Sequence, residues 1–309
     1  MTKQVAFGMQ LPVQSQSTLF VQAWEPGAGA AEMVRVTQAC ETAGFAYVAV
    51  CDHVAIPRPQ AETMSTSWWD TIATLSYLAA VTDRIGLLSH VYVLPYRHPL
   101  VAAKAWATLD ALSDGRAILG VGAGHVAAEF AALEVSFDDR GRLLDEAIDA
   151  VRAALADEYP THAGARWSFE ELGQRPRPTQ PAVPIWVGGS SRSAMRRAAE
   201  RGDGWLPQGP PKDGMAAGID YIRATRAASA RADDPIVLGA LSGPLYVGEP
   251  SWDTGRCVRG PAEKVAAYLR TYRDLGVDQI QVGFASRSVD ELCDQIAAYA
   301  VDVAPLVNS

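Results

Sequence analysis

Short apolar segments alternate with longer amphipathic segments along almost the whole chain of 309 residues. Short apolar runs bounded by turn residues are typical of buried strands, and apolar positions that recur at every third or fourth residue are typical of helices. The pattern predicts eight strands, at residues 5–10, 47–51, 85–94, 117–121, 185–187, 204–206, 236–247 and 279–283.

A helix is predicted after each of these strands. Glycines at 44 and 276 come just after two of them, as is common at helix carboxyl ends, and Pro261 stands where a first helical turn would begin. The predicted helices cover residues 31–43, 70–81, 99–111, 139–156, 191–201, 215–231, 261–275 and 289–300.

An unbroken series of strand–helix pairs predicts an α/β fold with a parallel sheet. An open doubly wound sheet is the competing arrangement. Eight pairs favour closure into a (β/α)8 TIM barrel, whose chemistry lies on the loops after the strand carboxyl ends. No shift in composition marks a second domain, so residues 1–309 are predicted to form a single domain with an insertion at about residues 157–183.

Charge and composition exclude several classes of partner. The net charge of −8, with no basic cluster, argues against nucleic acid. The apolar runs are broken well short of the roughly 18 residues that a membrane span needs, and the first residues show no leader pattern. Four cysteines without close pairs predict neither disulfides nor a zinc ribbon, which favours a cytoplasmic protein: Cys40, Cys51, Cys257 and Cys293.

One strand-to-helix junction has the features of a phosphate site. The apolar run at residues 185–187 stops at Gly188 and Gly189, and Ser190 and Ser191 lead into a helix. Free backbone N–H groups at the positive end of a helix dipole bind phosphate without any particular side chain. An ordinary strand-to-helix turn would look the same, so the junction alone leaves both interpretations open.

Three of the five histidines fall where predicted strands end. His53 follows the second strand, His90 lies in the third and His125 follows the fourth. A histidine at the catalytic face of a barrel can donate or accept protons near neutral pH. Asp52 precedes His53 and, because neighbours in a strand point to opposite faces, is expected to anchor the turn.

Glycines follow the fourth strand. Gly122 and Gly124 fit a loose dinucleotide-binding pattern, but the acidic residue at the end of a second strand that such a fold needs is absent, because residues 139–156 read as helix. We expect these glycines instead to let a flat ring or its tail lie close to the backbone.

The segment at residues 85–130 resembles the luciferase-like monooxygenase superfamily, and most of all its oxidoreductases that use the deazaflavin coenzyme F420. The likeness extends to Cys51-Asp52-His53, to the run at 184–191 and to Gly202–Trp205, and so covers nearly the whole chain. It implies a (β/α)8 barrel with an insertion, in agreement with the alternation of strands and helices.

The resemblance implies a role for individual residues. His53 matches a histidine beside the reacting ring, and Ser89–His90 match a position with a non-proline cis peptide and a bulge behind the ring. Gly188, Gly189 and Ser190 match the phosphate-contacting loop. The residues predicted to contact the cofactor are Asp52, Ser89, His90, Val91, Gly122, Gly124, Gly188, Gly189, Ser190 and Ser191.

Two positions depart from the family's sugar-phosphate dehydrogenases. His125 stands where those enzymes have a glutamate, and Pro57 stands where they have a tryptophan. Both groups belong to the sugar-phosphate reaction, so a different substrate is expected.

The main hypothesis is therefore an oxidoreductase that transfers a hydride between coenzyme F420 and a small organic substrate. His53 or His125 would supply or remove the proton, and the loop at 55–67, with Trp68 and Trp69 at its end, could close over the substrate. A homodimer is consistent with the resemblance.

Three alternatives stay open. The first is an FMN-dependent monooxygenase that uses reduced flavin and O2. The second is a metal-dependent barrel hydrolase with His53, His90, His125 and Asp52 as ligands, although the first strand lacks a metal-binding histidine pair. The third is a cofactor-binding protein without catalytic activity.

Overall fold

Eight parallel strands close into a barrel in a computed structural model that describes residues 4–309. Neighbouring strands pair in the order β1–β2–β3–β5–β8–β9–β10–β12, and β12 pairs back with β1. The predicted TIM barrel is confirmed, and each predicted strand is present. The barrel strands are β1 (Ala6–Gln10), β2 (Tyr47–Val50), β3 (Gly86–Ser89), β5 (Ala117–Gly122), β8 (Ile185–Gly188), β9 (Gly204–Leu206), β10 (Val237–Val247) and β12 (Gln279–Phe284).

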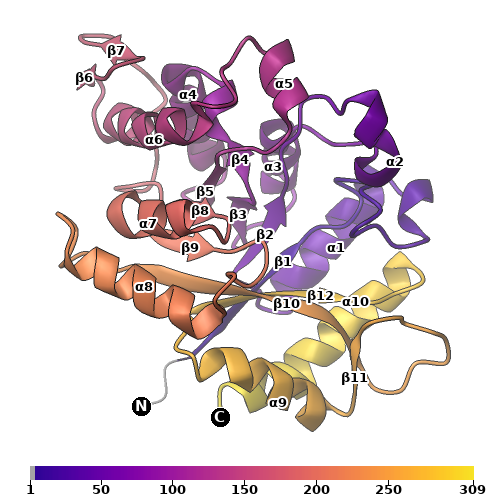
Figure 1. The fold of residues 1–309 in the computed structure, drawn as a ribbon. Coiled ribbons are helices and arrows are strands. Elements are labelled where there is room, and N and C mark those ends of the chain that lie inside the picture. Colours follow the sequence, from indigo (N-terminus) through magenta and orange to yellow (C-terminus); the bar gives the residue numbers. More distant parts are fainter. Residues whose placement is uncertain (1–3) are drawn as a thin grey trace.

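Helices surround the barrel (Figure 1). Their starts follow local capping chemistry: the side chains of Asp70, Ser191 and Ser288 each accept a backbone N–H from the first helical turn. The helices are α1 (Ala30–Thr42), α3 (Thr71–Ala79), α4 (Pro99–Leu112), α6 (Arg140–Ala156), α7 (Arg192–Arg201), α8 (Met215–Ala227), α9 (Ala262–Arg273) and α10 (Val289–Ala298).

Short elements were missed because they span too few residues to show a period. They include α2 (Ala61–Met64), α5 (Ala127–Ala132) and β11 (Val258–Gly260), which extends the sheet beside β10. The chain ends in a π-helical turn at Tyr299–Val303 and the short α11 (Ala304–Val307). The helix predicted at 215–231 ends earlier, at Ala227.

The third predicted strand, at 85–94, is wrong in its continuity. It divides into β3 and the short β4 (Tyr92–Val93), separated by a cis peptide bond between His90 and Val91, one residue beyond the Ser89–His90 position implied by the resemblance. At the break the Ser89 hydroxyl donates to the Gly120 carbonyl oxygen (2.8 Å) and accepts from the Gly120 N–H (3.0 Å). A side chain thus replaces backbone pairing there, while β4 resumes pairing with β5.

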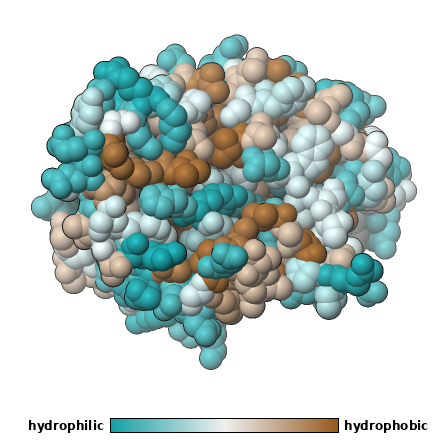
Figure 2. All heavy atoms as spheres, turned by 90° about the horizontal axis from the view of Figure 1, so that it is seen from above, coloured by the Kyte–Doolittle hydropathy of each residue, from teal (hydrophilic) through white to brown (hydrophobic). Residues whose placement is uncertain are grey.

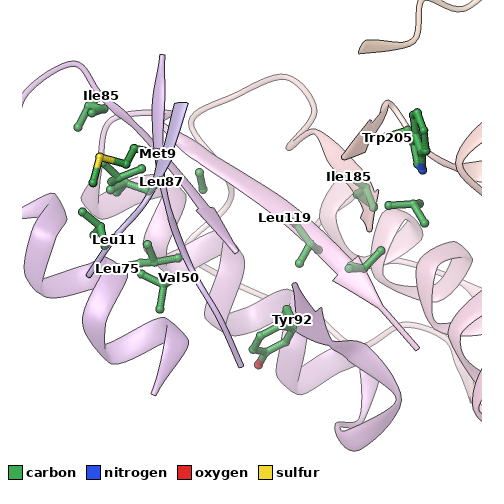
Figure 3. Close-up of a cluster of buried hydrophobic side chains, with 14 of the residues drawn as sticks. Met9, Leu11, Val50, Leu75, Ile85, Leu87, Tyr92, Leu119, Ile185 and Trp205 are labelled. Atoms are coloured by element: carbon green, nitrogen blue, oxygen red, sulfur yellow. The ribbon is translucent and has the colours of Figure 1, made fainter. Parts of the chain in front are cut away.

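The core has two layers. Inside the barrel, Tyr47, Ala49, Leu88, Trp186 and Leu206 pack together. A larger cluster fills the space between strands and helices, where side chains such as Val50, Leu75 and Leu87 meet (Figure 3). Because the strands contribute apolar side chains to both layers, they read in the sequence as continuous apolar runs.

The insertion between α6 and β8 contains a small antiparallel hairpin, β6 (His162–Ala163) and β7 (Ser168–Phe169). The guanidinium of Arg177, in the same insertion, donates to carbonyl oxygens of Ala154, Leu155 and Asp157 at the end of α6. The insertion is therefore attached to the barrel by capping one of its helices.

Hydrophobic and hydrophilic residues are interspersed on the face shown in Figure 2. Within residues 4–309, no helix is both long and apolar enough to cross a membrane. The prediction that the first residues show no leader pattern concerns in part residues 1–3, which lie outside the described residues.

Glu291, in the first turn of α10, joins the β10–β11 loop to the barrel. It accepts hydrogen bonds from the Tyr246 hydroxyl (3.0 Å), the Trp252 indole (3.1 Å) and the Arg287 backbone (2.7 Å). Burial alone would raise the pKa of this carboxyl, but the hydrogen bonds, above all those from Arg287, lower it to about 2.

We predict that Glu291→Gln lowers the free energy of unfolding by about 2 kcal/mol at pH 7. The native pKa is depressed, so the carboxylate's contribution is present above its ordinary pKa and is lost as the pH falls toward 2. Urea unfolding at pH 7 and at pH 3 should show the difference from the wild type shrinking. Glu263→Gln, on the exposed first turn of α9, is the matched control; an equal loss in that variant would contradict the prediction.

Candidate active site

Two histidines from different strand ends face each other at the carboxyl end of the barrel. The ring centroids of His53, after β2, and His125, after β5, are 5.4 Å apart, and the planes meet at 85°. The Trp68 ring also packs against His53, with centroids 4.4 Å apart. The structure thus brings together both residues predicted to be catalytic.

A carboxylate that the sequence reasoning missed completes this group. Glu129 lies on α5 with a fully buried side chain, and its Oε2 is 2.7 Å from His53 Nδ1. Burial would raise the pKa of Glu129, but the hydrogen bonds from His53 and from the Ala55 and Val54 backbone outweigh it and hold the pKa below its ordinary value. The carboxylate is therefore ionised at neutral pH.

The sequence did contain a signal for Glu129. It stands four residues after His125, in the segment that leads from the glycines into α5. The comparison with the sugar-phosphate dehydrogenases concerned position 125 alone. The carboxylate that meets His53 is instead that of Glu129, one helical turn further along the chain.

Although His125 is exposed, partial desolvation lowers the pKa of its ring. The neighbouring His53 lowers this pKa further. The His125 imidazole is thus neutral at pH 7 and can accept a proton. His98 and His162 lie elsewhere: His98 caps α4, and His162 lies in the hairpin of the insertion.

Asp52 anchors the turn, as the strand geometry predicted. Its two oxygens accept from Arg97 Nη1 (2.6 Å) and Nη2 (2.8 Å), and one of them also accepts the Val93 N–H (2.7 Å). The carboxylate is buried and its partners are supplied within the protein. A direct contact between Asp52 and a cofactor stays a prediction.

His90 lies inside the barrel with both ring nitrogens engaged. Gln281 Nε2 donates to His90 Nδ1 (3.2 Å), so the other nitrogen, Nε2, carries the proton and donates to the Leu206 carbonyl (3.2 Å). Burial lowers the pKa of His90 to about 4, so the ring is neutral. Beside it, the Cys51 thiol accepts from Gln10 Nε2 (3.2 Å).

The glycines have a packing role that the sequence did not reveal. Val91, which follows the cis peptide bond, occupies the space where a Cβ would lie at both Gly122 and Gly188. At Gly124, which has φ +77°, side chains of Val93 and Phe130 fill the same space. These glycines accommodate the bulge of the third strand, and their contact with a cofactor stays a prediction.

The junction between β8 and α7 has the geometry of an anion site. Gly189 adopts φ +97°, which glycine tolerates, and its carbonyl accepts the Trp205 indole N–H (2.9 Å). The Ser190 hydroxyl donates to the Gly209 carbonyl, and Ser191 caps the N–H of Ala194 (3.2 Å). The first N–H groups of α7 have no partner within the helix, and they lie at the positive end of its dipole.

The loop that follows β2 is hydrogen bonded to the loop that follows β1. Backbone N–H groups of Gln16 and Thr18 donate to the carbonyls of Ser67 (3.0 Å) and Thr63 (2.9 Å). Trp69 N–H donates to the Gln14 carbonyl (3.0 Å). The position of Trp68 beside His53 is therefore fixed in part by hydrogen bonds from the loop after β1.

The metal-ligand set of the hydrolase alternative is not assembled. Asp52 binds Arg97, and both nitrogens of His90 are engaged inside the barrel. In the described part of the chain, no group of three or more histidine, cysteine or acidic side chains could hold a metal ion.

The fold thus brings two histidines and the β8–α7 junction to the same end of a (β/α)8 barrel. The sequence model of the luciferase-like monooxygenase family matches residues 6–254, and the chain belongs to that family. It is thus an oxidoreductase of a family whose members depend on coenzyme F420 or on a flavin.

Relatives of both kinds are similar to this chain. An F420-dependent hydroxymycolic acid dehydrogenase of Mycobacterium tuberculosis is 32% identical over 57% of this chain and 48% of its own. An FMNH2-dependent dimethylsulfone monooxygenase of Pseudomonas fluorescens is 29% identical over 63% of this chain and 52% of its own. The chain thus spans about half the length of these two curated relatives.

The fold is also found among solved structures. A monooxygenase from Streptomyces bottropensis superposes with a TM-score of 0.80 at 20% identity, covering 97% of this chain and 99% of its own. At this identity the likeness concerns the fold alone.

Proposed function

We propose that this protein transfers a hydride between coenzyme F420 and a small organic substrate. The observation that carries the proposal is the pair of histidines, His53 and His125, facing each other at the same end of the barrel as the β8–α7 anion site. Hydride transfer to or from an oxygenated carbon needs a partner for the accompanying proton, and neutral imidazoles perform this task near pH 7.

The residues present fit a cofactor with a ring and a phosphate tail. The left-handed Gly189, the hydroxyls of Ser190 and Ser191 and the start of α7 would hold the phosphate. The half-buried Val91, on the bulge after β3, would support the ring. When bound, the deazaflavin supplies the two-electron chemistry.

The protein's own side chains would orient the substrate and move the proton. His53, whose side chain is only 9% exposed and is enclosed by Trp68 and Glu129, would exchange a proton at Nε2. His125 is the more exposed of the two and would contact the substrate or relay the proton. Because His125 replaces the glutamate of the sugar-phosphate dehydrogenases, we expect a substrate other than a sugar phosphate.

FMN is the second candidate cofactor, because the similar dimethylsulfone monooxygenase uses FMNH2. We favour F420 from the resemblance of residues 85–130. Both cofactors share a planar ring and a phosphate, so the histidines and the anion site would suit either.

A binding titration tests the proposal. Purified protein is titrated with F420 and with FMN, each oxidised and reduced, and fluorescence quenching is followed. We expect F420 to bind with a Kd well below about 100 μM, which corresponds to roughly −5.5 kcal/mol, and FMN to bind more weakly. Preferential binding of reduced FMN would overturn the choice of F420, and binding of neither would overturn the proposed function.

A further inference from the structure

Glu129 makes more contacts around His53 than a simple ion pair needs. Its Oε1 accepts the backbone N–H groups of Val54 (2.7 Å) and Ala55 (3.0 Å). Its Oε2 accepts from the Tyr96 hydroxyl (3.1 Å) and lies 2.7 Å from His53 Nδ1. One buried carboxylate thus holds the turn after β2 and the ring that the turn carries.

The arrangement determines which nitrogen of His53 carries the proton. An ionised carboxylate is only an acceptor, so a nitrogen 2.7 Å from its oxygen must be a donor. In the neutral ring Nδ1 then carries the proton and Nε2 presents a lone pair. The tyrosine cannot alter this, because Tyr96 donates to the same oxygen, and burial beside Glu129 raises its pKa and keeps it protonated.

The ring orientation is set as well. The planes of His53 and Trp68 meet at 62°, and those of His53 and His125 at 85°, so two aromatic rings contact His53 while Glu129 holds its Nδ1 edge. A side chain with 9% exposure in this enclosure has little freedom to rotate.

From these contacts we propose that Glu129 is a positioning residue. It holds His53 as the Nδ1–H tautomer so that Nε2 serves as the proton acceptor at the active site. The effect of Glu129 on turnover rests on the proposed function, whereas its effect on the tautomer does not.

The decisive variant is Glu129→Gln. A glutamine can keep both backbone hydrogen bonds only by turning its oxygen toward Val54 and Ala55, which turns its NH2 group toward His53 Nδ1. Nδ1 must then accept, and the proton moves to Nε2. We expect the tautomer to be reversed in the variant, and turnover to fall about 100-fold or more because the acceptor nitrogen is now protonated.

The measurement is long-range ¹H–¹⁵N NMR of the histidine rings, in which protonated and unprotonated nitrogens resonate in separate regions. His53 is assigned from the signals lost in His53→Asn. Wild-type protein is expected to show His53 protonated at Nδ1, and Glu129→Gln to show it protonated at Nε2. This readout needs no cofactor or substrate, so it stands even if the proposed function fails.

Two controls accompany the variant. Tyr96→Phe removes one hydrogen bond to Glu129 and should leave the tautomer unchanged, and Glu263→Gln, on the exposed face of α9, should change neither tautomer nor turnover. Circular dichroism and unfolding midpoints check that each variant is folded. A wild-type ring protonated at Nε2 would overturn the proposal even if Glu129→Gln does not fold, and an unchanged tautomer in folded Glu129→Gln would overturn it as well.

Discussion

Replacing His53 by asparagine is expected to lower kcat by about 10²- to 10⁴-fold, the usual contribution of a general acid or base. Asparagine places an N–H donor close to the position of Nδ1, so the hydrogen bond to Glu129 can persist while the proton-exchanging Nε2 is lost. The loss should appear in kcat because the substitution leaves the proposed cofactor contacts at the β8–α7 junction untouched. Cofactor affinity, measured by fluorescence quenching, should change less than threefold.

The matched control is His162→Asn, which makes the same exchange in the hairpin of the insertion and should leave turnover unchanged. His125→Asn separates the two histidines at the site. If His125 rather than His53 exchanges the proton, His125→Asn will show the larger loss of kcat. Wild-type turnover in both active-site variants would show that neither histidine takes part in proton transfer.

Gly120→Ala is expected to cost at least about 3 kcal/mol of folding stability. A Cβ at this position of β5 would lie within 3 Å of the backbone carbonyl oxygen of Ser89. Backbone inside a barrel cannot move aside as a flexible side chain can, and the Ser89 hydroxyl is hydrogen bonded to the same glycine. The variant should therefore disturb the bulge that carries His90 and Val91.

Gly283→Ala provides the matched control, since Gly283 also lies in a barrel strand but has no atom within 4 Å of its Cβ position. We expect its free energy of unfolding, measured in urea, to match that of the wild type within about 0.5 kcal/mol. Soluble yield and urea unfolding of the two variants decide the matter. Equal stability of Gly120→Ala and the wild type would mean that β3 and β5 can separate at the bulge.

Much of the fold follows from local pattern. The runs at 47–51 and 117–121 and the amphipathic helices between strands predicted the order of elements, because buried strands and half-buried helices leave different periods in a sequence. Periodicity did not predict the break near His90, because residues 85–94 are apolar on both sides of the bulge and no glycine or proline stands at it. Only the resemblance implied a bulge there, at Ser89–His90.

Local chemistry predicted part of the site. His53 and His125 were found because histidines after strand ends share one face of a parallel barrel. Ser191 was found as part of a strand-to-helix junction, and Asp52 as the anchor of a turn. In each case the signal lies within a few residues of the side chain concerned.

The sequence by itself determined the barrel, the order of its elements and the face at which His53 and His125 lie, because each depends on periodicity and on residues close together in the chain. Only the tertiary structure decided that Glu129 meets His53 and that Val91 occupies the space above Gly122 and Gly188. The residues of these contacts are separated by 31 to 97 positions, and closure of the barrel brings them together. Their pairing depends on strand register and on the bulge after β3, and neither leaves a local pattern in the sequence.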